Sequence, residues 1–357
     1  MHGRLRIVAL ALSLAALAGH APAQAQGDPK SCPTMKEVTI RTSREGKAVK
    51  EGGILYARGD QVVQLHAVIK GTLSGRKVSY GAPPDAMGIS APSAWPAECP
   101  VTLRWAKVEA LPVAYNNAYS APPAEIEITE TEWTEGWTVT ADVHPTRMHD
   151  EYPQVATGYG TMRFKVTATT AAGQVSSPGQ ECRRSGALCP AVFTLSYRPD
   201  DTYLGYLHEL MNVPYIYGSK RIQGGHQSDL LVGSDCADFA VYGKRRQSSR
   251  KKFDYTYTGG LYKLASKRTK VHLDDEAYYV DARNRRLTFG ADGAVRPGDL
   301  LNLPDGHVGV LVRDNGNGFL DTSDFLMHTL FREPETVPIK DARWGNIDGK
   351  EVLRLKR

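Results

Sequence analysis

The feature that most restricts the fold is an alternation of apolar and polar residues with a period of two, repeated through the first half of the chain. It occurs in VVQLHAVI (62–69), VTLRW (101–105), WTVTADV (137–143) and MRFKVTA (162–168). Successive side chains of a strand point to opposite faces, so this period buries one face and leaves the other polar. Short strands of this kind, separated by Gly, Pro and Asn turns, predict an all-β sandwich over residues 26–198.

Within that region, the stretch GTMRFKVTATTAAGQVSSPG (160–179) resembles a strand, a hairpin and a second strand of an immunoglobulin-like domain. The resemblance implies an immunoglobulin-like sandwich. We identify no catalytic constellation in this half of the chain.

Near residue 199 the spacing of the apolar residues changes from every second residue to every third or fourth residue, as in a helix. In SYRPDDTYLGYLHELMNV (196–213), four apolar residues share one helical stripe: Leu204, Leu207, Leu210 and Met211. A candidate helix from Asp235 to about Lys244 follows, and then come strands at DLLNL (299–303), HVGVLV (307–312) and FLMHTLF (325–331). Helices followed by strands predict a compact α+β domain over residues 199–357.

The first 25 residues have the pattern of a secretory signal peptide. Arg4 and Arg6 precede an apolar run from Ile7 to Ala18, and a small-residue cleavage pattern ends at Ala25. The apolar run is too short to span a bilayer, so we expect no membrane anchor after cleavage and a periplasmic or secreted protein. A net charge of +5 is modest and does not indicate a nucleic-acid partner.

The chain has five cysteines, and an oxidising compartment favours their pairing. Cys182 and Cys189 flank the short loop RRSGAL, and Cys32 with Cys99 would then tie the N-terminal strand into its domain. Three pairings of these four residues are possible. Cys236 lies apart from the others and is expected to remain a thiol.

The surroundings of Cys236 indicate a nucleophile. In GSDCADFAVYGKRR (233–246), Asp235 reads as the cap of an apolar helix that Cys236 begins. The pKa of a thiol falls at a helix N-terminus and beside an imidazole. The segment RPGDLLNLPDGHVGVLV (296–312) supplies that imidazole, because His307 opens a strand.

Five segments in this order resemble the NlpC family of papain-like cell-wall peptidases. They are VPYIYGS (213–219), SDCADF (234–239), RPGDLLNL (296–303), HVGVLV (307–312) and FLMHTLF (325–331). The resemblance covers roughly residues 200–335 and implies a papain-like form of the α+β domain. It implies Cys236 as nucleophile, His307 as its base, His328 as the group that orients the base, and Tyr215 as a helper at the oxyanion site.

The chain departs from the family pattern in two ways: in the residues after the cysteine, and in the gaps from Cys236 to His307 and from His307 to His328, which are longer than is usual in the family. Ala237 and Asp238 follow the cysteine where the family has Ser-Gly, and a carboxylate at Asp238 would oppose thiolate formation. Asp321 or Asp324 is an alternative to His328 as the orienting group. We favour His328, because an uncharged polar third member fits the logic of a triad.

Two further motifs can each be interpreted either as a functional site or as an ordinary structural feature. RDNGNGFLDTSD (313–324) is an imperfect calcium loop with candidate ligands Asn315, Asn317, Asp321 and Asp324, but Arg313 stands where an aspartate is needed. We therefore favour a hairpin tip there and expect no metal. The basic run GKRRQSSRKK (243–252) is expected to be a solvated face; the alternative is a landing surface for anionic envelope polymer.

These observations predict an exported cysteine hydrolase that needs no cofactor. By resemblance to the family, its substrates would be amide bonds in peptidoglycan stem peptides, cleaved through a thioester. The alternative is a non-catalytic cell-wall or protein-binding module, and a hydrolase of another amide or ester is a third reading.

Overall fold

The computed structural model describes residues 32–49, 53–81, 93–110, 127–146, 158–184, 187–248, 253–331, 333–342 and 347–356. The predicted signal peptide, residues 1–25, lies outside them. No helix in these ranges is both long and apolar enough to cross a membrane.

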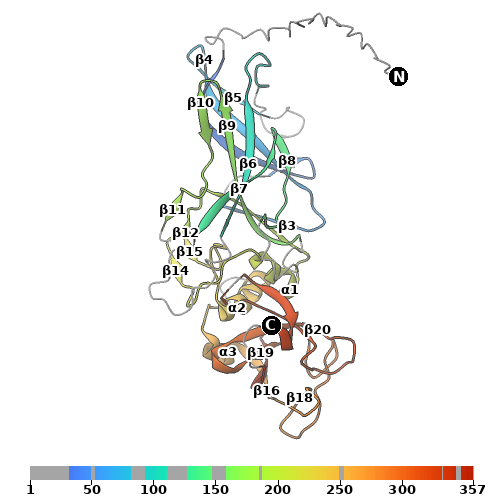
Figure 1. Cartoon of the computed structure of the whole chain (residues 1–357). Coiled ribbons are helices and arrows are strands. Elements are labelled where there is room, and N and C mark those ends of the chain that lie inside the picture. Colours follow the sequence, from blue (N-terminus) through green and yellow to red (C-terminus); the bar gives the residue numbers. More distant parts are fainter. Residues whose placement is uncertain are drawn as a thin grey trace, which may run out of the picture.

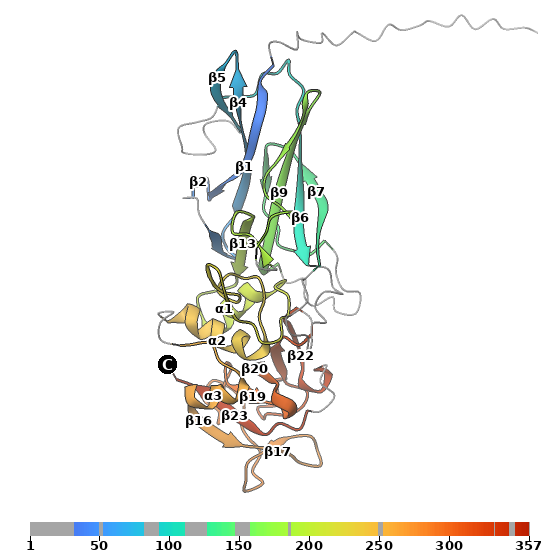
Figure 2. The same cartoon turned by 90° about the vertical axis from the view of Figure 1, so that its left-hand side faces the viewer.

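Two antiparallel-rich sheets face each other in the first part of the chain (Figures 1 and 2). One sheet has the order β2-β1-β4-β5, with β8 also paired to β4: β1 (Thr34–Arg44), β2 (Lys47–Ala48), β4 (Val63–Leu73), β5 (Arg76–Tyr80) and β8 (Thr138–Thr140). The other has the order β3-β13-β9-β6-β7, with β10 paired to β9: β3 (Ile54–Arg58), β6 (Thr102–Ala110), β7 (Ile128–Glu135), β9 (Gly160–Thr170), β10 (Gly173–Ser176) and β13 (Phe193–Arg198). A small pair, β11 (Arg183–Arg184) and β12 (Ala187–Leu188), precedes β13.

The alternating apolar residues of both sheets form a single core between them. Leu65 and Ile69 of β4 point inward from one sheet, and Trp105 of β6 and Phe164 of β9 do so from the other; all four are fully buried. Burying this apolar area is the main stabilising contribution to a sandwich of this size.

Two disulfides reinforce this part of the chain. Cys32 is bonded to Cys99 and Cys182 to Cys189, which confirms the expected pairing, and Cys236 is a buried free cysteine. Disulfides persist in oxidising environments, as expected of a protein that is exported.

The second part of the chain is built on a six-stranded antiparallel sheet with the order β16-β23-β19-β20-β21-β22. Its strands are β16 (Ala265–Lys270), β19 (Leu300–Asn302), β20 (Val308–Arg313), β21 (Phe325–His328), β22 (Glu335–Pro338) and β23 (Glu351–Leu355). Two small pairs of strands accompany it: β14 (Arg221–Ile222) with β15 (Gly225–His226), and β17 (His272–Leu273) with β18 (Tyr279–Val280).

The helices of this part are α1 (Tyr203–Leu207), α2 (Cys236–Gln247) and α3 (Thr258–Leu264), with 3₁₀ turns η4 (His208–Leu210), η5 (Pro304–Gly306) and η6 (Ile339–Asp341). Figures 1 and 2 both show α1 and α2 between the sandwich and this sheet.

The predicted fold class, an immunoglobulin-like sandwich followed by an α+β papain-like domain, is wrong. The described chain is mostly β in both parts, and its three α-helices have 5, 12 and 7 residues, too little helix for a helical α+β domain. The helical stripe near residue 199 gives one turn of α1 and then the 3₁₀ turn η4. The backbone leaves the helical region at Met211, with a ψ of 143°, and at Asn212, with a positive φ of 63°, so the stripe does not continue as a helix.

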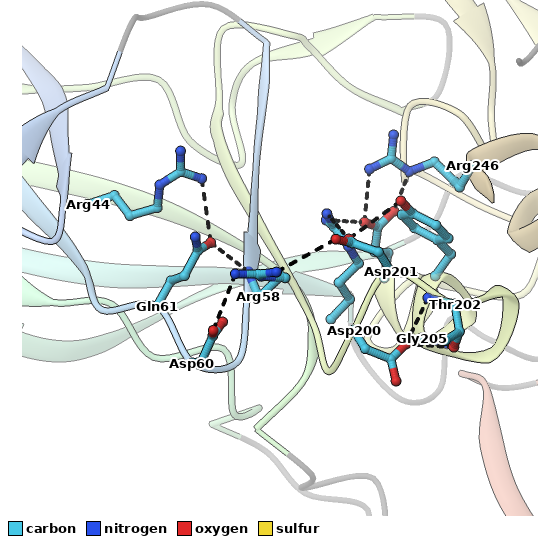
Figure 3. Close-up of polar contacts among 12 residues, drawn as sticks. Arg44, Arg58, Asp60, Gln61, Asp200, Asp201, Thr202, Gly205 and Arg246 are labelled. Carbon is cyan, nitrogen blue, oxygen red and sulfur yellow. Dashed lines mark hydrogen bonds and ion pairs between the residues drawn. The ribbon is translucent and has the colours of Figure 1, made fainter. Parts of the chain in front are cut away.

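Polar contacts cover the outer side of the junction between the two parts. Figure 3 shows Arg58 between Asp60 and Asp201. Its guanidinium nitrogens lie 3.3 Å from Asp60 Oδ2 and 3.8 Å from Asp201 Oδ2. Thr202 caps α1 by accepting the backbone N–H of Gly205 at 3.1 Å. The pair of Arg58 with Asp201 joins the end of β3 to the segment just before α1.

The carboxylate of Glu209 is fully buried at the same junction. It accepts hydrogen bonds from Arg198 of β13 at 2.9 Å and from Arg246 of α2 at 2.6 Å, and it also binds the hydroxyl of Tyr242. The guanidinium of Arg246 also stacks over the ring of Tyr56 in β3, 4.0 Å from its centroid. Glu209 therefore connects the sandwich to the helix that begins with Cys236.

Candidate functional site

The start of α2 is fixed by its cap. The Asp235 side chain accepts the backbone N–H of Asp238 at 2.8 Å, which satisfies one of the N–H groups that a helix leaves unpaired in its first turn. The residues after Cys236 are buried against the sheet, because Phe239, Ala240 and Val241 belong to the core of the second part. Cys236 is therefore held at the first position of a rigid helix and is 8% exposed.

The thiol of Cys236 lies against the backbone on both sides of His307. Its Sγ is 4.0 Å from the carbonyl oxygen of Gly306, and the backbone N–H of Val308 donates to the sulfur. The turn η5 and the start of β20 thus bring His307 to the N-terminus of α2, as the sequence led us to expect for a nucleophile and its base.

A line of buried polar side chains leads away from the thiol: His307 lies just before β20, His328 ends β21 and Glu335 begins β22. His307 Nε2 is 3.0 Å from His328 Nδ1, and His328 Nε2 is 3.0 Å from Glu335 Oε1. Their residues are 1%, 1% and 4% exposed. The structure therefore brings Cys236, His307 and His328 together and adds Glu335, which the sequence analysis did not identify.

Only the pairing of β21 with β22 places Glu335 at the site. It lies directly opposite His328 in the antiparallel pair of β21 and β22. Side chains of opposed residues lie on the same face of a sheet and contact each other. Finding Glu335 from the sequence required the register of this hairpin, which the motif spacing does not supply.

The electrostatics of the site favour neutral groups at rest. Burial raises the pKa of the Cys236 thiol above its ordinary value, and the Asp235 carboxylate raises it further, while the backbone N–H groups of Val308 and Ala237 lower it. Burial lowers the pKa of His307 well below its usual range, and His328 lowers it further. The resting pair is therefore a protonated thiol beside a neutral imidazole.

Two carboxyl groups lie at the start of α2: that of the half-buried cap Asp235 and that of the buried Asp238 in the first turn. Burial and their mutual proximity raise the pKa of Asp238, and burial raises that of Asp235. The Ser219 hydroxyl donates to Asp238 Oδ2 at 2.5 Å, and His226 Nε2 lies 3.4 Å from the same oxygen. Asp238 is thus held by a polar cluster of its own and adds negative potential near the thiol whenever it ionises.

Tyr215 is placed beside the start of α2. It pairs with Ser234, two residues before Cys236, in an isolated parallel bridge. Its ring is 2% exposed and meets the ring of Phe331 edge-on, with centroids 5.4 Å apart. Tyr215 therefore lies between the segment that leads into Cys236 and the segment that follows His328.

The alternative orienting groups, Asp321 and Asp324, bind their own loop. Asp321 accepts from the side-chain amides of Asn315 and Asn317, and Asp324 accepts the backbone N–H of Asn315 at 2.8 Å. Burial raises the pKa of Asp324 to about 7. In the described ranges no group of three or more His, Cys, Asp or Glu residues is arranged to hold a metal ion. These contacts form a hairpin tip in which the N–H groups of Asn315 and Asn317 bind the carboxylates of Asp321 and Asp324.

The described cations of the basic run lie in the last turn of α2 and contact other parts of the protein. Lys244 stacks on the Tyr203 ring at 4.8 Å, Arg245 pairs with Asp229 at 2.8 Å, and Arg246 binds Glu209. Residues 249–252 lie outside the described ranges. The three described cations therefore hold α2 in place, and the expected solvated face does not apply to them.

One hollow is lined in part by α2, and a second lies next to it. The first, of about 450 Å³, is lined by His226, Asp229, Arg245 and Tyr255 among others. The second, of about 260 Å³, shares Asp229 with the first and is also lined by Tyr56 and other residues of the sandwich. Both parts of the chain line the second hollow.

Comparison of the chain with protein-family models, with curated proteins and with solved structures gave no match, so the site stands on the geometry of its own residues.

Proposed function

We propose that the protein is a cysteine hydrolase that cleaves amide bonds with Cys236 as nucleophile. One observation carries the proposal: the thiol lies against the backbone on both sides of His307, and His307 is hydrogen-bonded at 3.0 Å to His328. A nucleophile, a base and a group that orients the base are the three parts of covalent acyl transfer.

The neutral resting state sets the order of the steps. His307 takes the thiol proton as Sγ attacks the amide carbon, and a thioester forms. The imidazolium then gives that proton to the leaving amine, and His307 activates the water that hydrolyses the thioester to a carboxylic acid and regenerates the thiol. The backbone N–H of Cys236, at the first position of α2, is a candidate donor to the oxyanion.

Peptidoglycan stem peptides are the substrates we propose. The ordered segments around Cys236, His307 and His328 resemble wall peptidases, and the N-terminal segment has the pattern of an export signal. The link from a D-glutamyl residue to the following diamino acid is the bond to test first.

One observation favours a second function, that of a wall-binding module. Burial and the carboxylate of Asp235 both raise the pKa of Cys236, which disfavours a reactive thiolate. A chain whose thiol never ionises would bind a wall peptide without cutting it.

The test is digestion of purified sacculi by the mature protein, with fragments identified by mass. We expect Cys236→Ala to abolish release of peptides and His307→Ala to lower kcat by about 10²- to 10⁴-fold, the usual contribution of a general base. His328→Ala should have a smaller effect, because water partly replaces an orienting group.

The matched control is His272→Ala, which removes an exposed histidine of β17 in the same part of the chain and should leave turnover unchanged. Turnover that persists in folded Cys236→Ala would reject the hydrolase assignment. Sacculus binding without any released fragment from the unmodified chain would establish the second function instead.

A further inference from the structure

A polar pocket of about 450 Å³, lined in part by α2, takes no part in the steps of hydrolysis. Two opposite charges, those of Arg221 and Asp254, line it. We propose that the pocket is a subsite for a zwitterionic group, an ammonium and a carboxylate on one carbon, at the end of a substrate side chain. This rests on the proposed function in one respect, namely that the substrate is a peptide with a diamino acid next to the cleaved bond.

Two segments form walls of this pocket. In the hairpin of β14 and β15, Arg221 is directly opposite His226, so their side chains lie on the same face. The ring of Tyr255 stacks on the His226 ring, with centroids 3.9 Å apart, and this stack brings the segment that contains Asp254 against the hairpin. His226 Nε2 also lies 3.4 Å from Asp238 Oδ2, so the hairpin reaches the first turn of α2.

The remaining ionisable groups of the pocket are compensated or neutral. Asp229 binds Arg245 through Oδ2 and accepts the hydroxyl of Tyr255 on Oδ1, each at 2.8 Å. Burial lowers the pKa of His226 to about 4, so its ring is uncharged at neutral pH. Among the residues that the structure describes, neither of the two opposite charges at positions 221 and 254 forms an ion pair. The pocket therefore offers one cation and one anion to a ligand.

This pair of charges fits an amino-acid group. A guanidinium binds a carboxylate through two parallel hydrogen bonds, and a carboxylate binds an ammonium. The volume is also in the range of small-molecule pockets. The side chain of a diaminopimelic residue ends in both groups, whereas a lysine side chain ends in an ammonium alone. Arg221 would therefore distinguish the two diamino acids, and Asp254 would bind either.

The pocket lies within reach of a peptide that is bound at the thiol. From Asp254 the chain runs four residues to Thr258. Thr258 Oγ1 lies 3.5 Å from the position of a Cβ at Gly306, and the Gly306 carbonyl oxygen is 4.0 Å from Cys236 Sγ. Four residues span at most about 14 Å. A substrate of a few residues therefore extends from the thiol to this pocket.

The first test compares two soluble stem tripeptides that differ only in the diamino acid, diaminopimelic acid or lysine. We expect the mature chain to have the higher kcat/KM for the diaminopimelic peptide. Arg221→Ala should lower that kcat/KM by about tenfold, mostly through KM, and leave the lysine peptide unchanged, because a hydrogen bond between charged groups contributes about this much. Asp254→Asn should lower kcat/KM for both peptides by similar factors.

The matched control is Arg283→Ala, which removes an exposed arginine that does not line the pocket. It should leave the ratio of the two kcat/KM values unchanged. Equal cleavage of the two peptides by the unmodified chain, or the same loss for both peptides in Arg221→Ala, would overturn the inference and leave the hydrolase intact.

Binding to Cys236→Ala, measured by titration calorimetry, gives a second readout that needs no turnover. We expect the diaminopimelic peptide to bind more tightly than the lysine peptide, and the added Arg221→Ala substitution to remove the difference. This preference in a chain that cuts neither peptide when unmodified would reject the hydrolase and leave the subsite intact. If free diaminopimelic acid bound more tightly than the peptide, the pocket would belong to a free amino acid, and its role in substrate recognition would be overturned.

Discussion

The thiol of Cys236 lies at the first residue of α2, where a helix favours a negative charge, yet it is buried beside Asp235. Burial raises its pKa, so the helix terminus does not decide its protonation. The reactivity of the thiol depends instead on proton transfer to His307 during the reaction.

This protonation state predicts the pH dependence of alkylation. The rate of reaction of Cys236 with iodoacetamide should still increase above pH 9 in the folded chain, because only the thiolate reacts and the folded pKa lies above the ordinary value of about 8.5. The chain unfolded in urea should show a plateau soon after pH 9. A plateau below pH 7 in the folded chain would reveal a resting thiolate–imidazolium pair and contradict the neutral state.

At the scale of elements, the cap Asp235 and the first-turn residue Asp238 of α2 have carboxyl groups whose folded pKa values are raised. The folded chain therefore binds more protons than the unfolded chain above about pH 4, the ordinary Asp value, and the free energy of unfolding falls as pH rises through the raised pKa values. The helix that positions Cys236 is thus less stable at alkaline than at acidic pH on account of these groups.

Asp238→Asn should remove part of this pH dependence. An amide keeps an acceptor for the Ser219 hydroxyl but carries no charge, so we expect the free energy of unfolding at pH 8 to rise by about 1–3 kcal/mol, since each pKa unit corresponds to about 1.4 kcal/mol. At pH 4 the change should be small. Urea denaturation at both pH values measures it, with Asp254→Asn, at an exposed neighbour, as the control. If the free energy of unfolding changed with pH in Asp238→Asn as it does in the unmodified chain, the prediction of a raised Asp238 pKa would be contradicted.

At the scale of the whole molecule, the buried Glu209 connects the sandwich to α2. Removing one partner of a buried ion pair leaves uncompensated charge. Glu209→Ala should therefore lower the free energy of unfolding by about 3–5 kcal/mol, because Arg198 and Arg246 would lose their shared carboxylate. We expect the substitution also to expose the connection near residue 200 to limited proteolysis.

The matched control is Asp201→Asn. Asp201 also pairs with Arg198, but its side chain is 53% exposed, and exposed pairs contribute about 1 kcal/mol or less. Equal losses of stability in the two variants would contradict the view that Glu209 holds the two parts of the chain together.

The sequence determined the features that depend on local physical chemistry. The period-two segments near 62, 101, 137 and 162 form strands at the expected places, because alternation suits only a half-buried strand. Asp235 caps the helix that Cys236 begins, and an odd number of cysteines required one to remain unpaired. The order of Cys236, His307 and His328 also indicated which residues to examine.

Only the tertiary structure decided the features that depend on contacts between distant segments. Glu335 reaches His328 through the register of β21 and β22, Arg246 turns inward because Glu209 lies opposite it, and the thiol is neutral because the sheet buries it. The balance of helix and strand in the second part was misjudged for the same reason: the helical period of Leu204 to Met211 is local, whereas the six-stranded sheet forms through pairing of segments up to about 90 residues apart, such as Ala265 with Leu355. Motif spacing carries no information about such pairings, and burial, protonation and strand register all follow from them.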